Sequence, residues 1–415
     1  MNRLFCKARI VMIAVVTGAV LVGCQSTSSR VSSVGPGSVG PGSYTPAGTS
    51  KERKYNYSSD VFLDVAIPVF DPGLPTDNAG VIDWEEVADE GIWPQVRRLE
   101  ANQFSMETKK ALEKTKAFGS VSITPNAGAV ADVYVLGNIV YSDSEMVEIN
   151  VKVMDATNHT WGEKTFEHQV SRGFFRDAMN KDKDPYGPIY ANIASWVYDL
   201  LNDQSDEEKQ EIERVSDIRY AALYSNEAFG DYLTISRGEY KLTGLPAEND
   251  RMWQRIQAVK AKDEQFIDSL QNNYETFYVS ANSDYRKYQR ETLPLAIEAR
   301  EKREARNAKM IGAGILTVAA ILLDRNSSSG LAKDIAIAGA GVAGVLAYKD
   351  HSELSELSSV LDEAGSSLDI KVSPQVIEFE GEQIELAGTA AEQHAQLQAK
   401  LRELYELEST PDNAL

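Results

Sequence analysis

The chain has 415 residues, of which 43% are hydrophobic and 25% are charged. This length predicts more than one folded unit, and the composition is sufficient for ordinary apolar cores. Asp and Glu outnumber Lys and Arg by 62 to 42, which gives a formal charge of −20 at pH 7. Because so acidic a chain repels polyanions, we expect it to bind neither nucleic acid nor anionic lipid head groups.

The first 23 residues have the organisation of a secretory signal peptide, with three basic residues before an uncharged apolar run at 10–22. A run this short is not an ordinary membrane span. It ends in the sequence LVGC at 21–24, which resembles the lipobox of bacterial lipoproteins. The resemblance implies cleavage before Cys24 and attachment of palmitate-type acyl chains, which anchor a protein without a spanning helix. The alternative is an incidental thiol beside an ordinary cleavage site or at the end of a transmembrane anchor.

The residue after this cysteine bears on the destination of the protein. In the lipoproteins that the segment resembles, an Asp at this position favours the inner membrane, and this chain has Gln25. The resemblance therefore implies a protein of the outer membrane of a Gram-negative cell, held by its lipid and facing the periplasm. The only other cysteine, Cys6, lies in the predicted signal peptide, so the mature chain has no pair for a disulfide.

Composition and hydrophobic patterning predict an α+β protein in which a small α/β domain precedes a mostly helical region. The predicted units are a signal peptide (1–23), a lipidated N-terminus with a flexible Gly/Ser/Pro tether (24–60), an α/β domain (61–172), a helical region (173–309), an apolar glycine-rich helical hairpin (310–348), and a β-hairpin with a C-terminal helix (349–415).

The α/β domain has a regular order of apolar patterns. The expected elements are a buried strand within 61–71, a helix at 94–118, a short strand at 121–123, two strands at 131–142 and 146–157 joined as a hairpin, and a last strand at 159–170. In the fourth strand, Val147, Ile149, Val151 and Val153 alternate with polar residues, so we expect one face of that strand to meet solvent.

The order strand, helix, strand, hairpin, strand resembles the periplasmic domain at the N-terminus of TolB and in CsgG-like and LpoB-like lipoproteins. The residues that carry the resemblance are VAIPVF at 65–70, ADVYVLG at 131–137 and VKVMDAT at 151–157, where Asn158 replaces the usual Gly. What the resemblance implies is a module for binding and assembly rather than catalysis.

The pattern turns helical from 174 to 245, and one long helix is predicted over 246–309, which Pro294 should kink or split in two. Near the C-terminus, alternating runs on both sides of 380–382 predict a β-hairpin with an acidic outer face. A closing helix is expected at 390–407.

Two uncharged segments, 310–323 and 335–348, flank a polar loop and predict a helical hairpin. Each would be about 21 Å long as a helix, which is short of the roughly 30 Å core of an ordinary bilayer. Small residues in the second segment predict close helix packing, and the candidate membrane or oligomer contacts are Ala336, Gly339, Ala340, Gly341 and Gly344. Three interpretations stay open: a hairpin buried in the fold or between subunits, a glycine zipper in the outer membrane, and a contact at the membrane surface.

No motif predicts a catalytic site, a cofactor site or a metal site. The histidines (His159, His168, His351 and His394) lie in separate segments, and surface positions are favoured for the first two, although they could approach each other. Asp182 and Asp184 could bind a cation, but a solvated turn is favoured. The sequence GAGVAG at 339–344 fits a dinucleotide loop, with Asp362 downstream, but no βαβ pattern accompanies it.

These observations predict a non-enzymatic outer-membrane lipoprotein that acts as a structural or binding component of a cell-envelope assembly. Its partners would be outer-membrane lipid, through acylated Cys24, and a periplasmic protein or a second copy of itself. The alternative is a subunit of an oligomeric outer-membrane pore or secretion channel that contributes the hairpin at 310–348. A periplasmic hydrolase rests on no motif.

Overall fold

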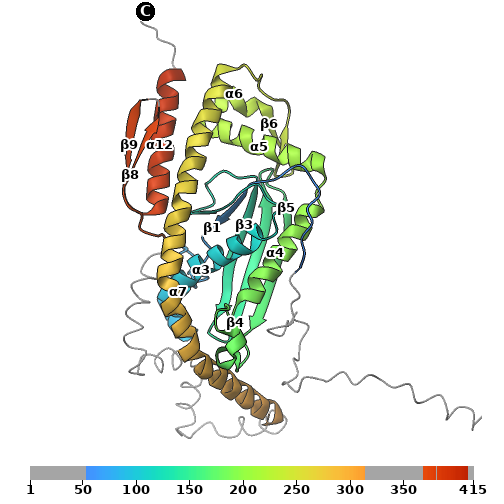
Figure 1. Cartoon of the computed structure of the whole chain (residues 1–415), viewed down its shortest axis with the longest axis vertical. Coiled ribbons are helices and arrows are strands. Elements are labelled where there is room, and N and C mark those ends of the chain that lie inside the picture. Colours follow the sequence, from blue (N-terminus) through green and yellow to red (C-terminus); the bar gives the residue numbers. More distant parts are fainter. Residues whose placement is uncertain (1–52, 314–367, 380, 410–415) are drawn as a thin grey trace, which may run out of the picture. The chain divides into compact units, whose positions relative to one another are not determined.

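The computed structural model describes residues 53–313, 368–379 and 381–409 (Figure 1). A mixed five-stranded sheet has the strand order β2-β1-β3-β4-β5. β1 pairs in parallel with β2 and β3, and the pairs β3–β4 and β4–β5 are antiparallel. The strands are β1 (Val65–Pro68), β2 (Val121–Thr124), β3 (Val133–Ser142), β4 (Met146–Asp155) and β5 (Thr160–Gln169). The predicted strands are present, although β1 is shorter than the apolar run that contains it.

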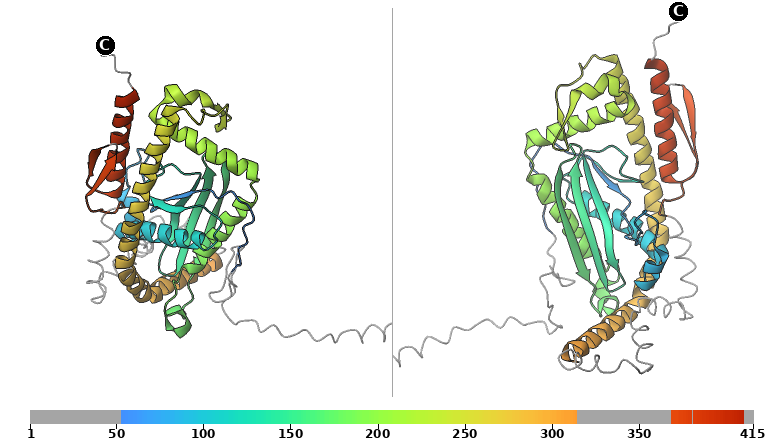
Figure 2. Two further views of the ribbon diagram at one scale, coloured as in Figure 1. Left: turned by 45° about the horizontal axis from the view of Figure 1, so that its top comes forward. Right: turned by 180° about the vertical axis from the view of Figure 1, so that it is seen from behind.

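Two helices, α3 (Pro94–Glu113) and α4 (Gly187–Asn202), cover one face of the sheet, as the front and back views show (Figures 1 and 2). Alternate residues of β4 turn into this layer, and Val147, Ile149, Val151 and Val153 are fully buried. On the opposite face, Glu163, Thr165 and Glu167 of β5 are exposed. On β4, the strand for which a solvent face was predicted, the outward residues Glu148, Asn150 and Lys152 are half-buried, so this face meets solvent in part.

A short helix, α2 (Trp84–Asp89), precedes α3, and 3₁₀ turns at Phe174–Arg176 and Ala178–Asn180 lead into α4. α5 (Asp206–Tyr224) begins with a capping box in which Ser205 and Glu208 satisfy each other's backbone N–H groups. It is followed by α6 (Asn226–Phe229) and a 3₁₀ turn at Gly230–Tyr232.

The prediction of helix throughout 174–245 is wrong at its end, where β6 (Leu233–Ser236) and β7 (Glu239–Leu242) form a hairpin. The two turn residues, Arg237 and Gly238, have φ values of 57° and 89°. Positive φ at both positions matches the twist of a two-residue hairpin and cannot continue a right-handed helix.

The longest element is α7 (Arg251–Ala313), a helix of 63 residues that lies against β2 and α3. Pro294 lies inside it, so of the two predicted outcomes, a kink or a split, the split does not occur. The ribbon bends in its second half (Figure 1). Because Pro294 is exposed, its ring lies on the solvent side of the helix and not on the packed side. From residue 301 to 304 every side chain is exposed.

The C-terminal β-hairpin and helix are confirmed as β8 (Gln375–Phe379), β9 (Glu382–Leu386) and α12 (Ala390–Ser409). Their apolar side chains share one core with α7, in which Phe266 and Leu270 meet Leu386, Leu397 and Leu401. The fold is therefore of the predicted α+β class. Among the described residues, none of the helices combines the length and the apolar character needed to cross a membrane.

Candidate functional site

Most of the residues predicted to carry function lie outside the described part of the chain. These are Cys24, the candidate contacts Ala336, Gly339, Ala340, Gly341 and Gly344, and also His351 and Asp362. Of the predicted apolar hairpin, only 310–313 is described, as the end of α7. The lipid anchor and the glycine-rich contact therefore stay predictions.

The described chain begins with a segment that is fixed to the outside of α4. The Arg53 guanidinium donates to both carboxylate oxygens of Asp199 at 2.9 and 2.5 Å, and this hydrogen bonding holds the pKa of Asp199 below its usual value. Tyr55 packs edge-on against Tyr198 with 4.9 Å between ring centroids. The chain from Arg53, within the stretch predicted as a tether, therefore lies against α4.

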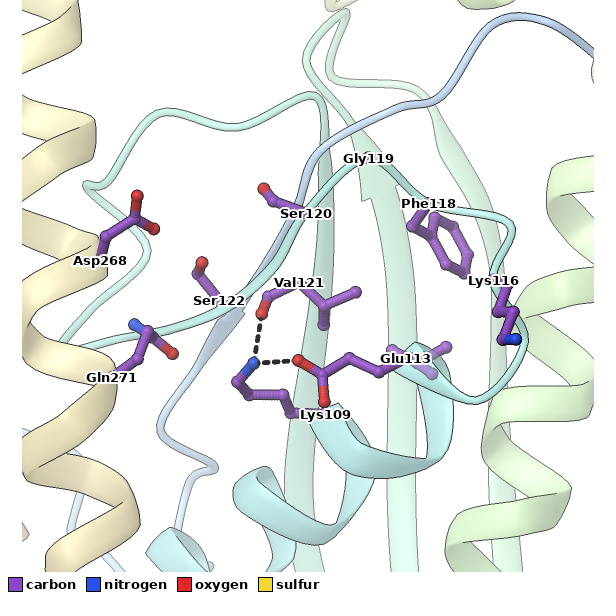
Figure 3. Close-up of a pocket in the computed structure, with 11 residues that line it drawn as sticks. Lys109, Glu113, Lys116, Phe118, Gly119, Ser120, Val121, Ser122, Asp268 and Gln271 are labelled. Atoms are coloured by element: carbon purple, nitrogen blue, oxygen red, sulfur yellow. Dashed lines mark hydrogen bonds and ion pairs between the residues drawn. The ribbon is translucent and has the colours of Figure 1, made fainter.

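A cavity of about 310 Å³ lies between the end of α3, the outer side of β2 and α7 (Figure 3). β2 is an edge strand, and side chains from the two helices pair with its free backbone groups. Gln271 of α7 accepts from the Ile123 N–H and donates to the Ile123 carbonyl, both at 2.9 Å. Lys109 of α3 donates to the Val121 carbonyl at 2.8 Å. These contacts close the edge of the sheet against pairing with another chain.

The lining of this cavity has paired charges and hydroxyl groups. Lys109 forms an ion pair with Glu113, while Asp268 lies on the α7 side and Ser120 and Ser122 lie along β2 (Figure 3). Positive and negative groups are present in equal measure once Lys116 is included. Such a lining suits hydrogen bonding to polar, uncharged groups such as peptide amides.

A second polar cluster lies where β1 and β3 begin, beneath α5 and α7. Asp132 is 7% exposed and accepts a hydrogen bond from the Asp64 N–H at 2.9 Å. Burial, the largest effect, raises the pKa of Asp132 to about 6, although that hydrogen bond lowers it. Lys260 of α7 approaches the same cluster and pairs with Asp217 at 2.6 Å. Asp132 can therefore take up a proton in mildly acidic conditions.

The structure does not bring together His159, which precedes β5, and His168, which lies within it. His159 is exposed beside Glu239, with 2.8 Å between Nδ1 and Oε1, whereas His168 lies at the far end of the strand. The surface position predicted for His168 is wrong: it is 5% exposed, and burial lowers its pKa. The reason is strand alternation, because His168 shares the inward face of β5 with Phe166.

The possible cation site at 182–184 is occupied by a different interaction. Asp184 forms a forked ion pair with Arg286 of α7, of which one bond is 2.8 Å, whereas Asp182 is exposed. Within the residues that the structure describes, there is no group of three or more His, Cys, Asp or Glu that could hold a metal ion. Asp184 therefore fastens the loop before α4 to α7.

One polar pair was missed by sequence reasoning. His394 of α12 and Asp263 of α7 are both buried, with 2.9 Å between Nε2 and Oδ1. The imidazole also stacks on Phe266 with an interplanar angle of 4°. The two residues are 131 positions apart, and neither lies in a recognisable motif, so no local signal could have paired them.

The chain was compared with protein-family models, with curated proteins and with solved structures, and none of them matches it. The resemblance to the TolB, CsgG and LpoB domains therefore rests on short sequence patterns and on the order of elements.

Proposed function

We propose that this chain is a lipid-anchored outer-membrane protein that faces the periplasm and serves, without catalysis, as a structural or binding component of a cell-envelope assembly. The observation that carries the proposal is the sequence LVGC at 21–24, placed directly after a short apolar run and before a Gly/Ser/Pro-rich stretch. The docking of Arg53 on α4 supports it, because a tethered protein needs its chain to enter the body at a defined point.

We further propose that the sheet with α3 and α4 is a module similar to those of TolB, CsgG-like and LpoB-like proteins. The element order β1, α3, β2, then the antiparallel β3, β4 and β5 supports this assignment. The second face of the sheet, half-buried on β4 and exposed along much of β5, leaves room for a partner protein or for a second copy.

The test of the anchor compares two cysteine variants in a Gram-negative host fed with labelled palmitate. Cys24→Ser should abolish labelling, whereas Cys6→Ser, the matched control within the predicted signal peptide, should keep it. After the membranes are separated, the Cys6→Ser protein should be found in the outer-membrane fraction. Labelling that persists in Cys24→Ser, or is absent from the unchanged protein, would refute the lipoprotein assignment.

The pore or channel subunit is a second candidate, and one observation favours it. α7 runs unbroken from the body to Ala313, four residues into the apolar segment, and the side chains of 301–304 are exposed although Glu301 pairs with Arg172. A Cys24→Ser protein exported with a non-lipoprotein signal separates the two candidates. If it stays in the membrane pellet after alkaline carbonate extraction in a folded form, the hairpin at 310–348 is a membrane element. Recovery in the soluble periplasm would leave the acyl chains as the anchor and refute the pore.

A further inference from the structure

The loop between β1 and α3 presents two large apolar side chains to solvent. Val81 is 60% exposed and Trp84, the first residue of α2, is 58% exposed. Tryptophan is the residue most often found as an energetic anchor of protein interfaces, and leaving it exposed has a cost in water. We call residues 75–90, which include this pair, the Trp84 loop. The loop therefore has the character of an interaction surface.

The loop holds a defined conformation. A β-bridge joins Thr76 to Ile82, and the Asp77 carboxylate accepts from the backbone N–H groups of Ala79 and Val81 at 2.8 and 2.9 Å. Val87 on the other side of α2 is buried, which fixes the helix to the body. Binding of a partner to Trp84 would cost little conformational entropy for ordering the loop, because Val81 and Trp84 are already positioned.

The charged side chains of the Trp84 loop itself all have one sign. Between Lys54 and Arg97 the sequence has no Lys or Arg. The exposed or half-exposed acidic residues of the loop are Asp77, Asp83, Glu85, Glu86, Asp89 and Glu90. Their field attracts a cationic surface and repels anionic lipid. It also disfavours a second copy of this chain, whose formal charge is −20.

We propose that the Trp84 loop is a docking site for a basic protein surface, in which an apolar pocket rimmed by Lys or Arg receives the Trp84 indole. This inference rests on the proposed function, since it names the surface and the chemistry through which the binding component engages a periplasmic partner. Lipid anchoring is tested separately by palmitate labelling, so a failure here leaves the anchor intact.

The test uses the mature chain with Cys24→Ser, labelled with 5-fluorotryptophan. The protein has five Trp residues, and Trp84→Phe identifies the Trp84 resonance in the ¹⁹F NMR spectrum. The probe is an amphipathic helical peptide with Leu on one face and Lys and Arg on the other. We expect a saturable change in the chemical shift of the Trp84 resonance as peptide is added. The affinity for the peptide should fall about fivefold or more when the salt concentration is raised from low to above the physiological level, because screening weakens the attraction. A peptide with every Lys and Arg replaced by Glu should leave the resonance unmoved.

Charge variants make the test specific to the loop. Asp83 caps the N-terminus of α2 by accepting from the N–H groups of Glu85 and Glu86. The triple variant Glu85→Gln, Glu86→Gln, Asp89→Asn leaves this cap intact and should weaken peptide binding about tenfold or more. The matched control neutralises three exposed acidic residues of the C-terminal hairpin, Glu378, Glu382 and Glu385, and should bind as the parent does. Equal weakening by the control, equal binding of the acidic peptide, or an unmoved resonance would overturn the proposal. So would a shift that depends on protein concentration alone, since it would assign the loop to self-association.

Discussion

Replacing Asp132 with asparagine should stabilise the protein at neutral pH. Burial raises the pKa of this carboxyl from 3.8 to about 6, so the fold favours the protonated form. Above pH 6, where the buried carboxyl is charged, its ionisation therefore lowers the free energy of unfolding. This destabilisation disappears as the pH falls below 3.8, the pKa of the group in the unfolded chain. The two pKa values differ by about 2, and at about 1.4 kcal/mol for each pKa unit the full cost is about 3 kcal/mol.

Asparagine keeps the oxygen that accepts from the Asp64 N–H and removes the buried charge. We expect the free energy of unfolding of Asp132→Asn, relative to the unchanged protein, to rise by about 2 to 3 kcal/mol between about pH 4 and about pH 7.5. The pKa of about 6 already includes the attraction to Lys260, which lowers it, so the expected gain takes the loss of this attraction into account.

Urea unfolding of the Cys24→Ser mature chain, followed by tryptophan fluorescence across this pH range, measures the difference. Asp182→Asn, at an exposed aspartate, is the control and should show no comparable trend. A difference between Asp132→Asn and the unchanged protein that does not vary with pH would refute the reasoning. A relative stability of the variant that falls as the pH rises would refute it as well.

Two further predictions concern packing and the C-terminal helix. Gly137→Ala places a Cβ 2.5 Å from ring atoms of the fully buried Phe70, so it should destabilise the protein by about 1 to 3 kcal/mol. The control is Gly173→Ala, whose added Cβ meets nothing within 4 Å, and it should be close to neutral in the same urea assay. His394→Leu removes the imidazole that pairs with the buried Asp263 carboxylate, and it should lower the free energy of unfolding by about 3 to 5 kcal/mol. Much of this stability should return in the double variant that also has Asp263→Leu. A double variant less stable than His394→Leu, or an undisturbed Gly137→Ala, would contradict these accounts.

Local patterns predicted the regular elements well where a strand or helix has one buried face. Alternation along β4 identified Val147 and Val151 as core residues, and both are fully buried. Apolar spacing placed the start of α3 at Pro94, although the helix ends at Glu113 and not at residue 118. It also predicted α7, which begins at Arg251 rather than at residue 246. The β6–β7 hairpin was missed because its strands have only four residues each and lie among helices. The Arg237-Gly238 step between two alternating runs was the available signal.

The polar contacts of the candidate site could not be predicted in the same way. Gln271 is an unremarkable residue of a long helix until α7 lies against the edge of β2, where its amide replaces a neighbouring strand. Asp184 was considered for a cation, and only the packing of α7 supplies Arg286 as its partner. Such assignments depend on which element lies opposite, and a local pattern contains no information about that.

The sequence by itself determined the class of fold, the periodic faces of its strands and helices, and the motif at Cys24 on which the proposed anchor rests, because each depends on neighbours within a few residues. Only the tertiary structure decided that Asp132 and His394 are buried and that Trp84 is exposed. Burial is set by segments far apart in the chain that fold against one another. For that reason, the pKa of Asp132, the pairing of His394 and the accessibility of Trp84 follow from packing rather than from local sequence.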